Sequence, residues 1–177
     1  EYKINFIRNS YIRFAKEHKK ELIDAFWNCV ERGDLILRKE VSIFEDKLAK
    51  YTGTKYGIGT NSGSDALLLS CIALGIKGNW DYLLKQVQEG KITLAQANDR
   101  FEGDEVITVS HTFIASIQCI VHAGARPILV DVGPNELMDA DLIEKAITKK
   151  TRAILPIHLY GQMADMKAIS KIAKKGQ

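Results

Sequence analysis

The sequence is poor in the residues that stabilise disulfide-rich or metal-dependent domains. It has three cysteines in 177 residues, and Cys29, Cys71 and Cys119 are far apart and set in apolar helical stretches. The four histidines are scattered and form no ligand cluster. This composition indicates buried thiols in a cytoplasmic protein and argues against a disulfide framework or a metal site.

Long apolar runs and a strong charge of one sign are also missing. No run approaches the roughly 20 apolar residues that a membrane span needs. The net charge is +3, and the lysines lie on helical stretches where a solvated face explains them. We therefore expect neither a membrane nor a nucleic-acid partner. The G-x-G-x-x-G and G-K-[ST] motifs are absent as well, which argues against a dinucleotide-binding fold and a Walker loop.

Three apolar runs predict the strands of a parallel sheet. Residues 105–110, 127–132 and 153–157 are rich in β-branched and aliphatic side chains, a pattern typical of strands that are covered on both faces. Predicted helices separate these runs, and this spacing favours parallel pairing with right-handed crossovers. A further short strand is expected at 56–60. The predicted fold class is α/β, with a mainly parallel sheet between helices.

Amphipathic periodicity predicts helices before, between and after these strands. Their expected ranges are 11–32, 41–52, 64–74, 113–122, 139–147 and 165–174. Residues 79–102 are polar and helical, with Thr93 as an expected N-cap, and we interpret them as a helical hairpin inserted at the surface. The sequence stops where another strand is expected, so we interpret it as part of a longer protein.

The stretch Gly57–Leu67 joins an expected strand to an expected helix through glycine and hydroxyl residues. Backbone N–H groups at a helix N-terminus attract anions, and glycine at 63 lets the backbone approach a ligand closely. The hydroxyls of Ser62 and Ser64 can add hydrogen bonds to a phosphate. Alternatively, Ser64 or Asp65 simply caps the helix. The turn alone leaves both interpretations open.

Aromatic and polar residues follow two of the expected strands, at the carboxyl edge where open parallel sheets bind ligands. Phe113 is placed to lie flat against a planar ring, although a core aromatic at a helix start is the alternative. His158 and Gln162 follow the third strand, and a purely structural role for His158 is equally open. No Ser-His-Asp or Cys-His arrangement is evident.

Three stretches and, more loosely, the opening amphipathic helix together resemble the DegT/DnrJ/EryC1/StrS family of sugar aminotransferases, fold type I enzymes that depend on pyridoxal phosphate. The three stretches are FEDKLAKYTGTKYGIGTNSGSDALLLSCIALGI, GDEVITVSHTFIASIQCIVHAGARPILVDV and LIEKAITKKTRAILPIHLYGQMADM. The likeness covers nearly all of the chain except 79–102. It implies an N-terminal helical arm at 1–35 and an incomplete, aspartate-aminotransferase-like large domain at 36–177, with the small C-terminal domain absent.

The resemblance also implies roles for individual residues. The cofactor-binding residues that it implies are Gly63, Ser64 and Asp65 at the phosphate of pyridoxal 5'-phosphate and Phe113 on its pyridine ring. His158 and Gln162 lie in the family's HLYGQ segment, near the site but without an assigned role. The Schiff-base lysine and the acidic partner of the pyridine nitrogen are expected beyond Gln177. No catalytic residue is therefore expected within 1–177.

For the intact protein, the resemblance implies transfer of an amino group from an amino acid, glutamate by analogy, to a keto group of a nucleotide-linked sugar. A homodimer is expected on the same ground. Two alternatives stay open. One is a sugar dehydratase of the same fold, in which a histidine replaces the lysine, and the other is a truncated, non-catalytic binding or assembly module.

Overall fold

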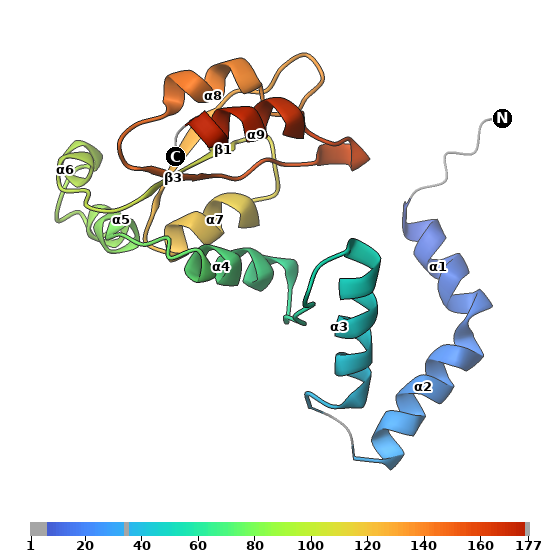
Figure 1. Cartoon of the computed structure of the whole chain (residues 1–177). Coiled ribbons are helices and arrows are strands. Elements are labelled where there is room, and N and C mark those ends of the chain that lie inside the picture. The colour runs from blue at the N-terminus through green and yellow to red at the C-terminus, as the bar shows by residue number, and fades with distance from the viewer. Residues whose placement is uncertain (1–6, 34–35, 176–177) are drawn as a thin grey trace. The chain divides into compact units, whose positions relative to one another are not determined.

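The computed structural model describes residues 7–33 and 36–175 (Figure 1). The chain divides into two units, Glu1–Gly59 and Thr60–Gln177. Of the predicted arm 1–35, residues 1–6 and 34–35 lie outside the described part. The boundary predicted after residue 35 therefore stays a prediction.

The first unit is helical. Its helices are α1 (Ile7–Glu17), α2 (Lys19–Glu31) and α3 (Lys39–Thr52). The single helix predicted over 11–32 is divided at His18, whose ψ of 15° departs from helical geometry. Hydrogen bonds continue across it, from the N–H of His18 to the carbonyl of Phe14 and from the N–H of Leu22 to the carbonyl of His18, both 3.0 Å. The division is thus a local kink.

The strand predicted at 56–60 does not form. This segment is irregular, and the N–H of Gly59 donates to the carboxylate of Glu45 on α3 at 2.7 Å. Glycine is required at position 57, because a Cβ there would lie 2.5 Å from the carbonyl oxygen of Glu45. The prediction was wrong because α3 takes the N–H group of Gly59 that a neighbouring strand would need.

The second unit contains a three-stranded parallel sheet in the order β2-β1-β3. Its strands are β1 (Glu105–Val109), β2 (Arg126–Val130) and β3 (Thr151–Ile154). The central strand β1 is buried along its whole length, and Ile107 pairs in register with Ile128 of β2 and Ile154 of β3. The predicted parallel sheet is confirmed.

Helices cover both faces of this sheet (Figure 1). The helices of the second unit are α4 (Gly63–Ala73), α5 (Trp80–Gln88), α6 (Leu94–Asp99), α7 (Ala115–His122), α8 (Ala140–Ala146) and α9 (Met166–Lys175), and α4, α7, α8 and α9 are the ones that pack on the sheet. One core joins Ile107 to Ile143 of α8 and Ile169 of α9. The other joins Val106 to Ile120 of α7 and to α4. The apolar strand sequences are explained by this coverage on both sides.

Residues 79–102, predicted as an inserted helical hairpin, contain α5 and α6, and these helices have a small core of their own. That they are an insertion stays a prediction. The hydroxyl of Thr93 accepts the N–H of Gln96, and the side chain of Gln96 accepts the N–H of Thr93, so the predicted N-cap is confirmed as a full capping box. Trp80 and Phe101 are among the residues of the insertion's core, with Val121 of α7 packed against it. The insertion is therefore bound to the domain by apolar packing.

Candidate active site

The start of α4 is organised by a serine cap. Ser62 has the extended backbone of an N-cap (φ −153°, ψ 164°), and its hydroxyl oxygen accepts the N–H of Asp65 at 3.1 Å. The same hydroxyl donates to the carboxylate of Asp65 at 2.9 Å. The interpretation in which Ser64 or Asp65 caps the helix is thus corrected, because Ser62 alone has the required backbone.

This cap leaves a short row of donors free at the first turn of α4. The N–H groups of Gly63 and Ser64 and the Ser64 hydroxyl have no hydrogen-bond partner among the described residues. Such N–H groups carry the partial positive charge of a helix N-terminus. A Cβ built on Gly63 would have nothing within 4 Å. An anion can therefore approach this backbone directly.

These donors border a hollow of about 580 Å³ between α4 and the start of α7. It is lined by Gly63, Ser64, Ala66, Leu67, Ser70, Phe113, Ala115 and Ser116. The Phe113 side chain is 73% exposed and belongs to the turn that follows the carboxyl end of β1. A hydrogen bond of 3.1 Å between the Thr112 and Ser116 hydroxyls holds this turn. Predicted site residues from two distant segments thus meet at one surface.

The other predicted residues do not line this hollow. The carboxylate of Asp65 is held by Ser62. Nδ1 of His158 accepts the N–H of Ala164 at 3.1 Å, which gives this histidine a structural role in the turn after β3. Gln162 is exposed and follows the short 3₁₀ helix η1 (Leu159–Gly161).

An aromatic pair lies at the same edge of the sheet. His111 follows β1, Tyr160 follows β3, and their rings meet edge to face with centroids 6.1 Å apart. Tyr160 has a φ of 53°, in the left-handed region that is unfavourable by about 1–2 kcal/mol for residues other than glycine. The sequence places both residues after strands at the carboxyl edge, but only the folded chain brings the two rings together.

Two buried cysteines lie in the core between α4 and α7. Burial raises the pKa of Cys71, and its hydrogen bond with Cys119 offsets only part of this effect. Burial, together with the neighbouring sulfur of Cys71, raises the pKa of Cys119 to about 12. Both side chains are therefore thiols at neutral pH and supply no nucleophile. Cys29, predicted to be buried, is only half-buried.

Across residues 7–33 and 36–175, no group of three His, Cys, Asp or Glu side chains is placed to hold a metal ion. Among the helices of that same part of the chain, none has both the length and the apolar character to cross a membrane.

Comparison with known proteins identifies a family that this chain matches. A sequence profile of the DegT/DnrJ/EryC1/StrS aminotransferase family matches residues 16–177. A relative from Micromonospora megalomicea subsp. nigra, dTDP-3-amino-3,4,6-trideoxy-alpha-D-glucose transaminase, is 33% identical over 167 residues. That match covers 94% of this chain and 38% of the relative.

Solved structures agree with the fold. The crystal structure of DesV from S. venezuelae superposes with a TM-score of 0.76 at 35% identity, covering 92% of this chain and 38% of DesV. NtdA from Bacillus subtilis, solved with bound cofactor PMP, gives a TM-score of 0.74 at 29% identity, covering 90% of this chain and 31% of NtdA. The chain thus spans less than two fifths of each of these proteins. The predicted fold type I large domain is confirmed, and the chain belongs to the DegT/DnrJ/EryC1/StrS aminotransferase family.

Proposed function

We propose that this chain is the N-terminal portion of a pyridoxal-phosphate-dependent aminotransferase. In this proposal the intact protein transfers an amino group from an amino acid, glutamate by the resemblance, to a keto group of a nucleotide-linked sugar. The observation that carries the proposal is the hollow in which the free donors of Gly63 and Ser64 lie beside the exposed ring of Phe113. The transaminase of a dTDP-sugar among the relatives supports the substrate class.

The residues of the hollow fit the cofactor in charge and shape. A phosphate group carries negative charge and needs several donors, which the N–H groups of Gly63 and Ser64 and the Ser64 hydroxyl supply at a helix N-terminus. Phe113 offers an apolar face to a planar ring. We assign Asp65 an indirect role, because its bond to Ser62 holds the cap that leaves the other donors free.

When bound, pyridoxal phosphate supplies the electron-withdrawing ring on which amino transfer depends. The residues of this chain bind and orient it. Ser64 and Gly63 fix the phosphate, and Phe113 fixes the plane of the ring. We place the lysine that binds the cofactor and the acidic partner of its ring nitrogen in the part of the polypeptide that follows Gln177.

We further propose that the protein acts as a homodimer. Large apolar side chains of the first unit are exposed, including Phe26 at 67% and Trp27 at 55%. Large apolar side chains left exposed are the kind of surface that protein–protein contacts cover. Light scattering of the intact protein tests this proposal, and a monomeric mass at micromolar concentration would contradict it.

The reaction class is tested by visible absorption of the purified protein with pyridoxal phosphate, before and after borohydride reduction, together with intact mass. We expect an absorption band that borohydride removes, with the cofactor then fixed to one lysine beyond residue 177. Bound cofactor with no tagged lysine would favour the dehydratase. No bound cofactor, at the mass of 177 residues, would favour a non-catalytic module.

Ser64→Ala in the intact protein is expected to weaken cofactor binding about 10- to 100-fold, since a hydrogen bond to a charged group contributes about 1.5–3 kcal/mol. Gly63→Val is expected to have a larger effect, because its side chain would occupy the space of the phosphate. Titration of the apoprotein with pyridoxal phosphate, followed by absorbance, gives both affinities.

Ser70→Ala is the matched control for these variants. Ser70 also lines the hollow, but its hydroxyl donates to the carbonyl of Ala66 at 2.7 Å and is not available to a ligand. The affinity of the Ser70→Ala variant for pyridoxal phosphate should equal that of the unmodified protein. Unchanged affinity in both Ser64→Ala and Gly63→Val would refute the phosphate assignment.

A further inference from the structure

The ring of Phe113 is placed by the turn that carries it. β1 ends at Val109 and α7 begins at Ala115, so residues 110–114 form the whole connection between strand and helix. Phe113 is 73% exposed and Ile114 is 60% exposed. Neighbouring side chains therefore do little to hold the ring, because packing stabilises a side chain in proportion to the apolar surface that it buries. The direction of the ring depends on the backbone of this turn.

The helix after this turn begins without a side-chain cap. Its N-cap residue, Ile114, has a helical backbone (φ −52°, ψ −29°) and makes no side-chain cap hydrogen bond. A polar capping side chain, such as that of Ser62 at the start of α4, satisfies a free N–H group and stabilises the first turn of its helix. The start of α7 is held by a different contact.

The hydroxyls of Thr112 and Ser116 provide this contact. They lie 3.1 Å apart, and the two residues stand on either side of Phe113 in the sequence, so their hydrogen bond closes a short loop around it. Two backbone hydrogen bonds tighten the same turn: the N–H of Thr112 donates to the carbonyl of Ser110 at 2.9 Å, and the N–H of Ser116 donates to the carbonyl of Phe113 at 3.1 Å. Ser116 is buried, so water cannot readily replace a lost partner of its hydroxyl.

Ser116 also lies beside the place proposed for the cofactor. It lines the hollow together with Gly63, Ser64 and Phe113. The free donors of the hollow belong to Gly63 and Ser64, whereas the Ser116 hydroxyl is bonded to Thr112. An effect of Ser116 on a ligand in the hollow therefore passes through the turn that carries Phe113.

We propose that Thr112 and Ser116 are positioning residues for the cofactor ring. The bond between their hydroxyls fixes the backbone on both sides of Phe113 and thereby the plane in which its ring meets the ring of pyridoxal phosphate. This role rests on the proposed function, because it takes pyridoxal phosphate as the ligand and Phe113 as its contact. The phosphate group is bound by Gly63 and Ser64. Loss of the hydroxyl pair should therefore disturb the ring of the cofactor and leave phosphate binding unchanged.

Two substitutions of Thr112 in the intact protein test this role. Thr112→Val removes the hydroxyl and keeps the branched shape, and it is expected to weaken binding of pyridoxal phosphate about 2- to 10-fold, the range for one neutral hydrogen bond. It should also reduce the visible circular dichroism of bound cofactor, because that signal depends on a fixed orientation of the ring. Thr112→Ser keeps the hydroxyl and should retain both values. The affinity for inorganic phosphate, measured by calorimetry, should be the same in all three proteins.

Ser116→Ala removes the other hydroxyl of the pair and should have the same effects as Thr112→Val. The double variant should bind pyridoxal phosphate no more weakly than either single variant, because all three lack the same hydrogen bond. If the losses of the single variants instead added in the double variant, the two hydroxyls would act separately and the pairing would be refuted.

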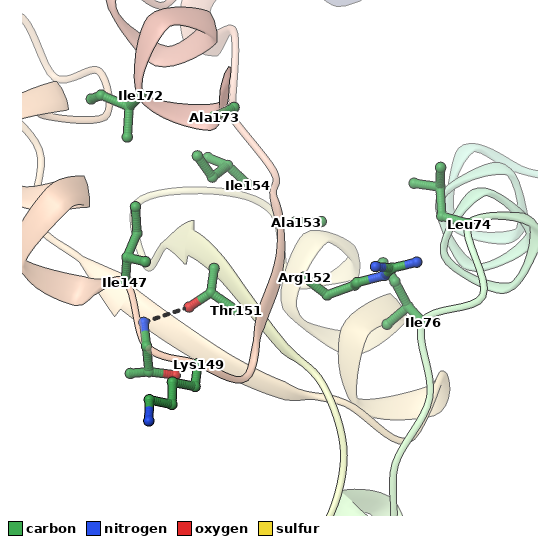
Figure 2. A pocket seen from close by; sticks show the side chains of 11 residues that line it. Leu74, Ile76, Ile147, Lys149, Thr151, Arg152, Ala153, Ile154, Ile172 and Ala173 are labelled. Carbon is green, nitrogen blue, oxygen red and sulfur yellow. Dashed lines mark hydrogen bonds between the residues drawn. The ribbon is translucent and has the colours of Figure 1, made fainter. Parts of the chain in front are cut away.

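Thr151→Val is the matched control, because Thr151 also holds a turn through its hydroxyl. That hydroxyl accepts the N–H of Thr148 at 2.9 Å, beside a groove along β3 (Figure 2). Thr151 pairs with Glu105, the first residue of β1, so this turn lies at the opposite end of the strands from Phe113. Thr151→Val is expected to lower the Tm but to leave the circular dichroism of the cofactor unchanged. If it reduced that signal as much as Thr112→Val does, general loss of stability would explain both, and the positioning role would be overturned.

Binding to the unmodified intact protein distinguishes the two possible failures. No binding of pyridoxal phosphate would contradict the proposed function and, with it, the positioning role. Normal binding, together with unchanged affinity and circular dichroism in Thr112→Val, would overturn the positioning role alone.

Discussion

Gly124→Ala is expected to destabilise the protein by more than about 3 kcal/mol, a large effect for a single added methyl group. Gly124 has a φ of 83°, and a Cβ at this position would lie 2.2 Å from the carbonyl oxygen of Gly78. Both groups are backbone, so neither can move as a flexible side chain would. The carbonyl of Gly124 also accepts the N–H of Trp80 at 2.8 Å, which ties the residue to the start of the insertion.

Gly75→Ala is the matched control, because Gly75 also has a positive φ, 72°, but a methyl group added there would have nothing within 4 Å. The Gly75→Ala variant should lose only about 1 kcal/mol of unfolding free energy, the conformational penalty of the left-handed region. Urea denaturation followed by circular dichroism measures both. Equal stability of the two variants would contradict the prediction that a Cβ at position 124 clashes with the carbonyl of Gly78.

Glu105→Gln is expected to destabilise the protein by about 3 kcal/mol at neutral pH, the range for breaking a buried ion pair. Glu105 is only 1% exposed, pairs with Arg126 and accepts a hydrogen bond from the Thr148 hydroxyl. The guanidinium of Arg126 lies over the rings of Phe101 and Trp80, at 4.7 and 5.8 Å. Without the carboxylate charge, the partly buried arginine loses its counter-ion.

In the same variant, the free energy of unfolding should decrease less steeply as the pH falls into the acid range. Burial alone would raise the pKa of Glu105, but the Thr148 hydrogen bond, Arg126 and nearby Lys150 outweigh it and lower that pKa. A lowered folded-state pKa gives stability that is complete above the unfolded pKa, about 4.3. This stability is lost as the pH falls through the folded value. Glu105→Gln removes that contribution, so its difference from the unmodified protein should shrink toward low pH.

Glu144→Gln is the control for this pH dependence. Its hydrogen bond with Lys175 and the charge of that lysine lower the pKa of Glu144, but the pair lies at the surface and exposed pairs contribute little. We expect no measurable change in the urea midpoint at neutral pH. If the difference in unfolding free energy between Glu105→Gln and the unmodified protein stayed constant down to low pH, the loss of stability in acid could not be assigned to Glu105.

Local patterns determined much of the fold from the sequence alone. The parallel strands follow from apolar runs that require cover on both faces, and Thr93 is followed three residues later by Gln96, which is sufficient for a capping box. Gly53 ends α3 with a φ of 71°, the left-handed conformation in which glycine commonly ends a helix. Each of these features depends on residues close together in the chain, so periodicity and spacing carry the information.

The remaining features were decided by the tertiary structure. Gly59 gave its N–H to Glu45 on α3 instead of to a strand. The meeting of Ser64 with Phe113 depends on how α4 packs against α7, and the pairing of Glu105 with its partners depends on strand order. Contacts between residues tens of positions apart leave no periodic trace in a single sequence. They exist only once the helices and strands have packed.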